Sequence, residues 1–186
     1  MNEPTTVLTD YALAAVSAWL GIKLFSASRG WAIAFLALAL GALFGGTWHG
    51  FWKSDVLWKA TTLCVGVASL GMLVGSTQHA TQGWTRRLLI AFAVVKFAVY
   101  SAWMLRHDDF IWVIADTGAA LLLVALLHLY RFNGWMLAGV AVSVLAGLAQ
   151  ASGMALHAHF NHNDLYHVIQ IAAMALFYRG VKRFLS

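Results

Sequence analysis

A dense polar stretch at residues 157–167 interrupts a sequence that is otherwise largely apolar. It contains four histidines, two asparagines and one aspartate, and a long apolar segment lies on either side of it. Polar and ionisable groups beside a lipid bilayer are costly unless they bind something or lie in water. We therefore interpret this stretch as one half of a metal-binding site.

His49 is the predicted other half of the site. It ends an apolar segment in the sequence Gly-Gly-Thr-Trp-His-Gly, residues 45–50. Glycines at such a position allow neighbouring backbone to approach closely. Taken alone, His49 is also compatible with a histidine at the headgroup interface that binds nothing.

The spacing within the polar stretch indicates which of its residues share a helix face. Asp164 and His167 are three positions apart, and Asn163 and His167 are four apart, so both pairs would face the same side. Helix capping would explain Asp164 or Asn163, but not His167 one turn further in. A catalytic zinc ion takes three protein ligands and keeps one open position. We predict that zinc is held by His49, His167 and either His162 or Asp164.

Three further polar residues near these ligands have less defined roles. Asp55 follows His49 by six positions and could orient a ligand or act as general base for a metal-bound water. It could equally be a solvated acid paired with a neighbouring lysine. His157 and His159 are expected to be loop residues.

Two charges are expected to lie deep inside apolar segments. Lys96 and Asp116 fall at similar depth in consecutive segments. Isolated charges are costly in this setting, so we predict a buried Lys96–Asp116 ion pair. A structural role is expected, with a proton relay as the alternative. Asp10 is expected to cap the first segment, with a role in orienting a ligand or as general base as the alternative.

The composition identifies the elements that must position these residues. Of 186 residues, 61% are hydrophobic and only 10% are charged, against roughly 25% charged residues in soluble domains. This favours an integral membrane protein.

The net charge of +5 comes from residues scattered at segment ends, so no nucleic-acid partner is expected. The single cysteine, Cys64, excludes both an intramolecular disulfide and a cysteine-based zinc cluster.

Seven apolar segments are long enough to cross a bilayer as helices, each needing about 20 residues. They cover residues 8–27, 31–51, 56–76, 86–105, 109–130, 134–156 and 165–184. Short polar breaks separate them, which forces each helix to pack antiparallel to the next. The predicted fold is all-α: a single seven-helix transmembrane domain over residues 1–186. No basic stretch precedes the first segment, so no cleavable signal peptide is expected.

The positions of Lys and Arg predict the orientation of this bundle. With the N-terminus outside, the cytoplasmic segments carry eight basic residues, Lys23, Arg29, Arg86, Arg87, Arg131, Arg179, Lys182 and Arg183. The outer segments carry three, Lys53, Lys59 and Arg106. The positive-inside rule then favours an outer N-terminus and a cytoplasmic C-terminus, in an inner or plasma membrane. The residues that would gather at the outer face are Asp10, His49, Asp55, Asp164 and His167.

This pattern resembles the CREST superfamily of seven-helix membrane hydrolases, which includes the alkaline ceramidases and the progestin/adiponectin receptors. His49 matches the family's histidine in the second span, His167 matches its second histidine in the seventh, and Asp55 matches its aspartate loosely. Gly45 stands where the family has a serine, and Asn163 stands where it has another histidine. The chain is similar to a divergent, bacterial-type member.

The resemblance implies a zinc-dependent hydrolase of amide- or ester-linked membrane lipids. Zinc would lower the pKa of a bound water and polarise a substrate carbonyl. Two other functions fit the same residues. One is a non-enzymatic protein or sensor that binds a metal or a lipid headgroup. The other is a b-type haem protein with two histidines on facing helices.

Overall fold

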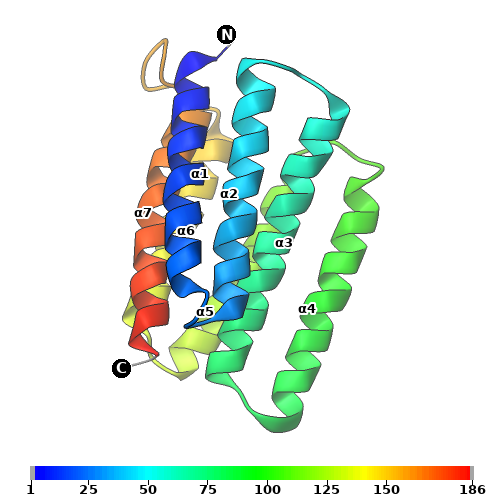
Figure 1. The fold of residues 1–186 in the computed structure, drawn as a ribbon, viewed down its shortest axis with the longest axis vertical. Coiled ribbons are helices and arrows are strands. Elements are labelled where there is room, and N and C mark those ends of the chain that lie inside the picture. The colour runs from blue at the N-terminus through cyan, green and yellow to red at the C-terminus, as the bar shows by residue number, and fades with distance from the viewer. Residues whose placement is uncertain (1–2, 185–186) are drawn as a thin grey trace.

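A computed structural model describes residues 3–184, and seven α-helices account for most of them (Figure 1). The helices are α1 (Pro4–Leu24), α2 (Arg29–Gly50), α3 (Asp55–Ala80), α4 (Gly83–Met104), α5 (Ile111–Tyr130), α6 (Gly134–Ser152) and α7 (His162–Arg183). No strand occurs within residues 3–184, where one isolated bridge joins His157 and Phe160. The predicted all-α class and the seven helices are confirmed.

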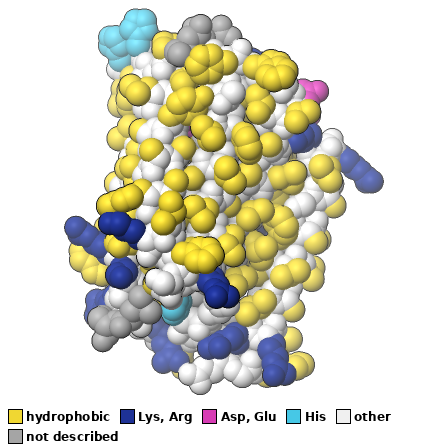
Figure 2. All heavy atoms as spheres, viewed as in Figure 1, with side chains coloured by type: hydrophobic (Ala, Val, Ile, Leu, Met, Phe, Trp, Pro, Cys, Tyr) yellow, Lys and Arg dark blue, Asp and Glu magenta, His cyan; other side chains and the backbone are white. Residues whose placement is uncertain are grey.

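Six of these helices, α1 to α6, are long and apolar enough to cross a membrane. The seventh differs because its first turns carry polar residues, among them Asp164, His167 and Gln170. Apolar side chains cover much of the outer surface, and Lys and Arg gather towards one end (Figure 2). An apolar exterior of this kind is the pattern of helices that face lipid.

The first helix begins earlier than the sequence predicted. Pro4 occupies its first turn, where proline has no hydrogen bond to lose and its fixed φ suits the helix. The expectation that Asp10 caps this helix is therefore wrong. Asp10 lies six residues inside α1 and is only 4% exposed. A carboxylate at this depth needs a partner.

The helices form a closed arrangement in which the first and last elements are neighbours (Figure 1). α1 packs against both α2 and α7, and α6 packs against both α5 and α7. α3 contacts α2, α4 and α5, whereas α4 lies at the edge and barely touches α5. The contact between α1 and α7 brings residues more than 150 positions apart in the sequence to the same end of the bundle.

Glycines allow the closest approach between helices. A Cβ atom added to Gly30 of α2 would lie 2.5 Å from the backbone nitrogen of Gly75 in α3. In the α6–α7 pair, a Cβ atom on Gly139 would lie 2.6 Å from the Phe177 ring. Small residues at such contacts let the backbones pack without an intervening side chain.

Gly30→Ala should therefore destabilise the bundle. Inserting a methyl group against backbone typically costs about 1–3 kcal/mol, so the midpoint of thermal unfolding in detergent should fall. The matched control is Gly147→Ala in α6, where an added Cβ would meet no atom within 4 Å. Equal midpoints for the two variants would contradict this account of the α2–α3 contact.

Candidate functional site

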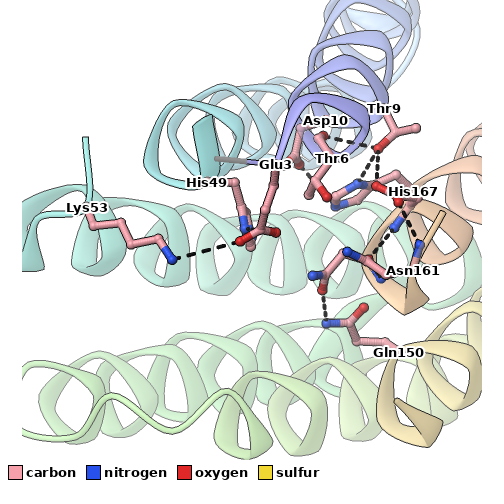
Figure 3. Close-up of polar contacts among 11 residues, drawn as sticks. Glu3, Thr6, Thr9, Asp10, His49, Lys53, Gln150, Asn161 and His167 are labelled. Carbon is pink, nitrogen blue, oxygen red and sulfur yellow. Dashed lines mark hydrogen bonds and ion pairs between the residues drawn. The ribbon is translucent and has the colours of Figure 1, made fainter. Parts of the chain in front are cut away.

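Polar side chains from three helices meet at one end of the bundle. They come from the first turns of α1, the last turn of α2 and the first turns of α7 (Figure 3). His49 and His167, which the sequence predicted to meet, both line one pocket at this end. Their α1 partners were not predicted.

The most buried contact in this region joins α1 to α7. Asp10 Oδ1 lies 3.0 Å from His167 Nε2, and Thr9 Oγ1 lies 3.0 Å from His167 Nδ1 (Figure 3). The imidazole of His167 is thus held on both ring nitrogens by consecutive residues of α1. Asp10 Oδ2 is buried and has no hydrogen-bond partner among the described residues.

Two hydrogen-bond arrangements satisfy this geometry. In the first, His167 Nε2–H donates to Asp10, and the Thr9 hydroxyl donates to Nδ1. In the second, Nδ1–H donates to Thr9 Oγ1, whose own hydroxyl donates to the Thr6 carbonyl oxygen at 3.1 Å. The second arrangement turns the Nε2 lone pair towards Asp10, so a proton or a cation must lie between them.

His49 is held from the opposite side of the site. Its Nδ1 lies 2.9 Å from Glu3 Oε2, and Glu3 Oε1 lies 3.8 Å from Lys53 Nζ (Figure 3). The Trp48 ring packs edge-on against the imidazole, with ring centroids 5.0 Å apart. These contacts leave Nε2 as the ring nitrogen of His49 that can bind a ligand.

Asp164 is engaged in starting α7. Asn161 N donates to Asp164 Oδ2 at 2.8 Å, while Asn161 Oδ1 accepts from the backbone of Asn163 and Asp164. This reciprocal pair is a capping box. Asp164 Oδ1 lies 3.5 Å from Thr9 Oγ1, so the cap also supports the α1–α7 contact.

The remaining predicted residues lie apart from His49 and His167. His162 begins α7, and Asp55 is exposed in the first turn of α3; neither lines the pocket that holds the two histidines. His157 and His159 lie in the exposed loop before α7, as expected. The carboxylate nearest to His167 belongs to Asp10.

The pocket at this end, which we call the polar pocket, has a volume of about 160 Å³. Its walls include Asp10, Trp48, His49, Gln150, Asn163 and His167. Gln150 Nε2 donates to Asn163 Oδ1 at 2.7 Å, so the two amides form a pair on one side. Gly46 leaves room for Asp10, because a Cβ atom there would lie 2.9 Å from the Asp10 Cβ atom, whereas one on Gly45 would make an ordinary contact 3.7 Å from Asp10 Oδ1.

A second, larger hollow of about 230 Å³ adjoins the polar pocket, and we call it the apolar cavity. It is enclosed mainly by apolar side chains of α2, α3, α5, α6 and α7. Leu38, Val65, Phe110 and Tyr166 line both spaces, so they mark the junction between them. A polar compartment that adjoins an apolar one suits an amphiphilic ligand.

The donors in the polar pocket suit zinc in their chemistry. One carboxylate has an unpartnered oxygen, and two imidazoles have Nδ1 held by Glu3 and Thr9, as histidine ligands usually do. Within residues 3–184, however, no three His, Cys, Asp or Glu side chains are grouped closely enough to hold an ion. An ion bound by Asp10 and His167 would replace the hydrogen bond that now joins them.

Sequence reasoning favoured a capping role for Asp10 over a role in this site, and it missed Glu3. The usable signal was Pro4, because a proline at the start of a helix places Asp10 inside α1 rather than at its end. A carboxylate inside an apolar helix requires a partner, which would have directed attention to a histidine on another helix. Glu3 gave no such signal.

The chain matches a protein family over residues 5–186. It belongs to DUF6962, a family of unknown function. No curated protein and no solved structure matches the chain. A function for the DUF6962 chain must therefore be inferred from the geometry of its own residues.

The ion pair expected away from this site is present in the DUF6962 chain. Lys96 Nζ of α4 lies 2.5 Å from Asp116 Oδ1 of α5, and both side chains are largely buried. Because α4 has few other contacts with α5, this pair is the main polar attachment between them among the described residues.

Asp116→Asn should destabilise the fold by leaving Lys96 buried without a counter-charge. Breaking a buried ion pair typically costs about 3–5 kcal/mol, so folded yield and melting temperature should both fall. The double variant Lys96→Met/Asp116→Leu should recover much of this loss. Asp109→Asn, at an exposed position, serves as the control. Normal stability of Asp116→Asn would exclude a structural role for the pair.

Proposed function

We propose that this protein is a membrane-embedded, zinc-dependent hydrolase of amide- or ester-linked lipids. The observation that carries the proposal is the polar pocket, where Asp10, His49 and His167 line one space that adjoins the apolar cavity. The proposed ligands are these three residues, with Asp10 in place of His162 or Asp164. Binding of the ion would draw the three side chains together, since they are not grouped closely enough to hold one as they lie.

The resemblance to the CREST superfamily is part of the same proposal. His49 and His167 keep the positions of two family histidines, and their meeting in one pocket supports the resemblance. At the positions of the family serine and the other histidine stand Gly45 and Asn163. Asp10 lies beside Gly45, so a carboxylate from α1 supplies a donor that the substituted positions lack.

Zinc, when bound, would supply a Lewis acid that polarises the substrate carbonyl and makes water more acidic. Asp10 would bind the ion through Oδ1, and its Oδ2, which has no partner among residues 3–184, would accept the proton of the attacking water. The Gln150–Asn163 amide pair orients the polar head of the substrate. Trp48 and Trp58, whose rings are 5.0 Å apart in the pocket wall, restrict the access of bulk water.

The lipid substrate enters from the side of the bundle. Gly118 of α5 and Gly147 of α6 both line the apolar cavity, and a Cβ atom on either would meet nothing within 4 Å. Val144 and Leu148 line the same cavity and are 45% and 61% exposed. These features support an opening between α5 and α6 that faces the acyl chains of the bilayer.

We propose that α7 also spans the membrane, with the N-terminus outside, in the plasma or inner membrane. Its packing along α1 and α6 supports a seventh span. Eight of the Lys and Arg residues counted above lie at or near the helix ends opposite the polar pocket. Figure 2 shows Lys and Arg gathered towards one end of the molecule. By the positive-inside rule, this end is cytoplasmic and the polar pocket faces outwards.

A non-enzymatic lipid-binding protein is the second candidate function. The direct contact between Asp10 and His167 favours it, because the two residues satisfy each other without an ion. In this case the apolar cavity holds a lipid, and the polar pocket binds its headgroup. Zinc content and lipid hydrolysis distinguish the two functions.

The purified wild type should contain about one zinc ion per chain, consistent with one three-ligand site. His49→Ala, His167→Ala and Asp10→Asn should each lose the metal and any hydrolysis of N-acyl lipids. Glu3→Gln should weaken zinc binding about tenfold or more, because Glu3 anchors His49. Metal analysis, a thermal melt and an assay with a ceramide-like lipid measure these effects.

His157→Ala is the matched control, since His157 lies in the exposed loop. A folded wild-type protein that binds no zinc would contradict the proposed hydrolase function. Retained zinc and lipid binding without any hydrolysis would favour the non-enzymatic function.

Gly147→Trp should obstruct the opening between α5 and α6. Because the added side chain meets no neighbouring atom at its Cβ, the fold and zinc content should be unchanged. Binding of a fluorescent acyl lipid should fall by about tenfold, equivalent to about 1.4 kcal/mol. Gly134→Trp, at an equally open position outside both cavities, is the control. Equal lipid binding by the two variants would contradict lateral access.

A further inference from the structure

Three polar side chains stand in the wall of the apolar cavity. They are Thr117 of α5, Ser143 of α6 and Gln170 of α7. Gln170 Nε2 donates to Ser143 Oγ at 3.3 Å, and these two residues are 8% and 6% exposed. Thr117 Oγ1 is buried and has no hydrogen-bond partner among residues 3–184.

Packing between helices explains the presence of only two of these three polar side chains. The Gln170–Ser143 bond can attach α7 to α6, as polar residues do between membrane helices. Thr117 has no such explanation, because its hydroxyl reaches no protein group within the described part of the chain. Burying a hydroxyl without a partner is unfavourable, and in native proteins a water or ligand usually satisfies it.

The polar set lies close to the polar pocket. Gln170 follows His167 by three residues, so the two share a face of α7 about 4.5 Å apart along the helix axis. Tyr166 lines both hollows and marks the passage between them. A chain that runs from His167 into the apolar cavity would meet Gln170 and its partner Ser143 within its first few carbons, and Thr117 lies in the wall of the same cavity.

We propose that the apolar cavity is specific for acyl chains that carry a hydroxyl group near the carbonyl, as in β-hydroxyacyl lipids. The hydroxyl donates to Gln170 Oε1 or Ser143 and accepts from Thr117 Oγ1, while the rest of the chain contacts the apolar wall. This inference rests on the proposed function for one point, that the carbonyl end lies beside Asp10 and His167.

The test is competitive binding to the purified full-length protein in detergent. Hexadecanoic acid and 3-hydroxyhexadecanoic acid each displace a fluorescent fatty acid, with and without added zinc. One net hydrogen bond corresponds to about a fivefold preference for the hydroxylated acid in the wild type. Thr117→Val and Gln170→Met should lose this preference and keep the affinity for hexadecanoic acid.

Two features keep the result interpretable. Thr117→Val removes a hydroxyl that bonds to no described protein group, so its melting temperature should be unchanged, whereas Gln170→Met also removes the bond to Ser143. Thr85→Val, at an exposed position of α4, is the matched control and should keep the preference.

Equal affinity of the wild type for both acids, or a preference retained in both cavity variants, would overturn this inference. If zinc binding is intact, neither result contradicts the proposed hydrolase function. Conversely, a preference for the hydroxylated acid in a protein that binds no zinc would support the proposed specificity of the apolar cavity and contradict the hydrolase function.

Discussion

The contact between Asp10 and His167 is the interaction on which the rest of this end of the bundle depends. A carboxylate inside an apolar helix is costly to bury, and here the cost is offset by an imidazole from the last helix of the chain. Thr9 fixes the other ring nitrogen, and the capping box at the start of α7 supports Thr9 in turn. The first and last helices are therefore joined by polar contacts as well as by packing.

The attachment of α1 to α7 determines the shape of the two hollows inside the bundle. With α1 and α7 held together, the polar pocket is closed on one side and adjoins the apolar cavity at Phe110 and Tyr166. The two hollows differ sharply in chemistry, yet they share walls. An amphiphile with its polar group beside His167 and its chain among α5, α6 and α7 matches this division.

The proposed resemblance to membrane hydrolases would take a specific form in this chain. Under that proposal, His49 and His167 stand at the positions of two family histidines, while Gly45 and Asn163 stand where a serine and a further histidine would be. The absence of a side chain at Gly46 is what allows Asp10 of α1 to lie beside α2, because a Cβ atom there would lie 2.9 Å from the Asp10 Cβ atom. Under the same proposal, Asp10 of α1 supplies the pocket with a donor that Gly45 and Asn163 do not, a contact that the spacing of motifs along the sequence does not reveal.

The sequence by itself determined the all-α class, the number of helices, the pairing of Lys96 with Asp116 and the meeting of His49 with His167. These follow from apolar segment lengths, short connections and the cost of isolated charge, all of which are local or nearly local properties. Only the tertiary structure decided that Asp10 replaces Asp164 as the carboxylate beside His167. The physical reason is that a capping box engages Asp164 locally, whereas the partner of Asp10 depends on how α1 packs against α7.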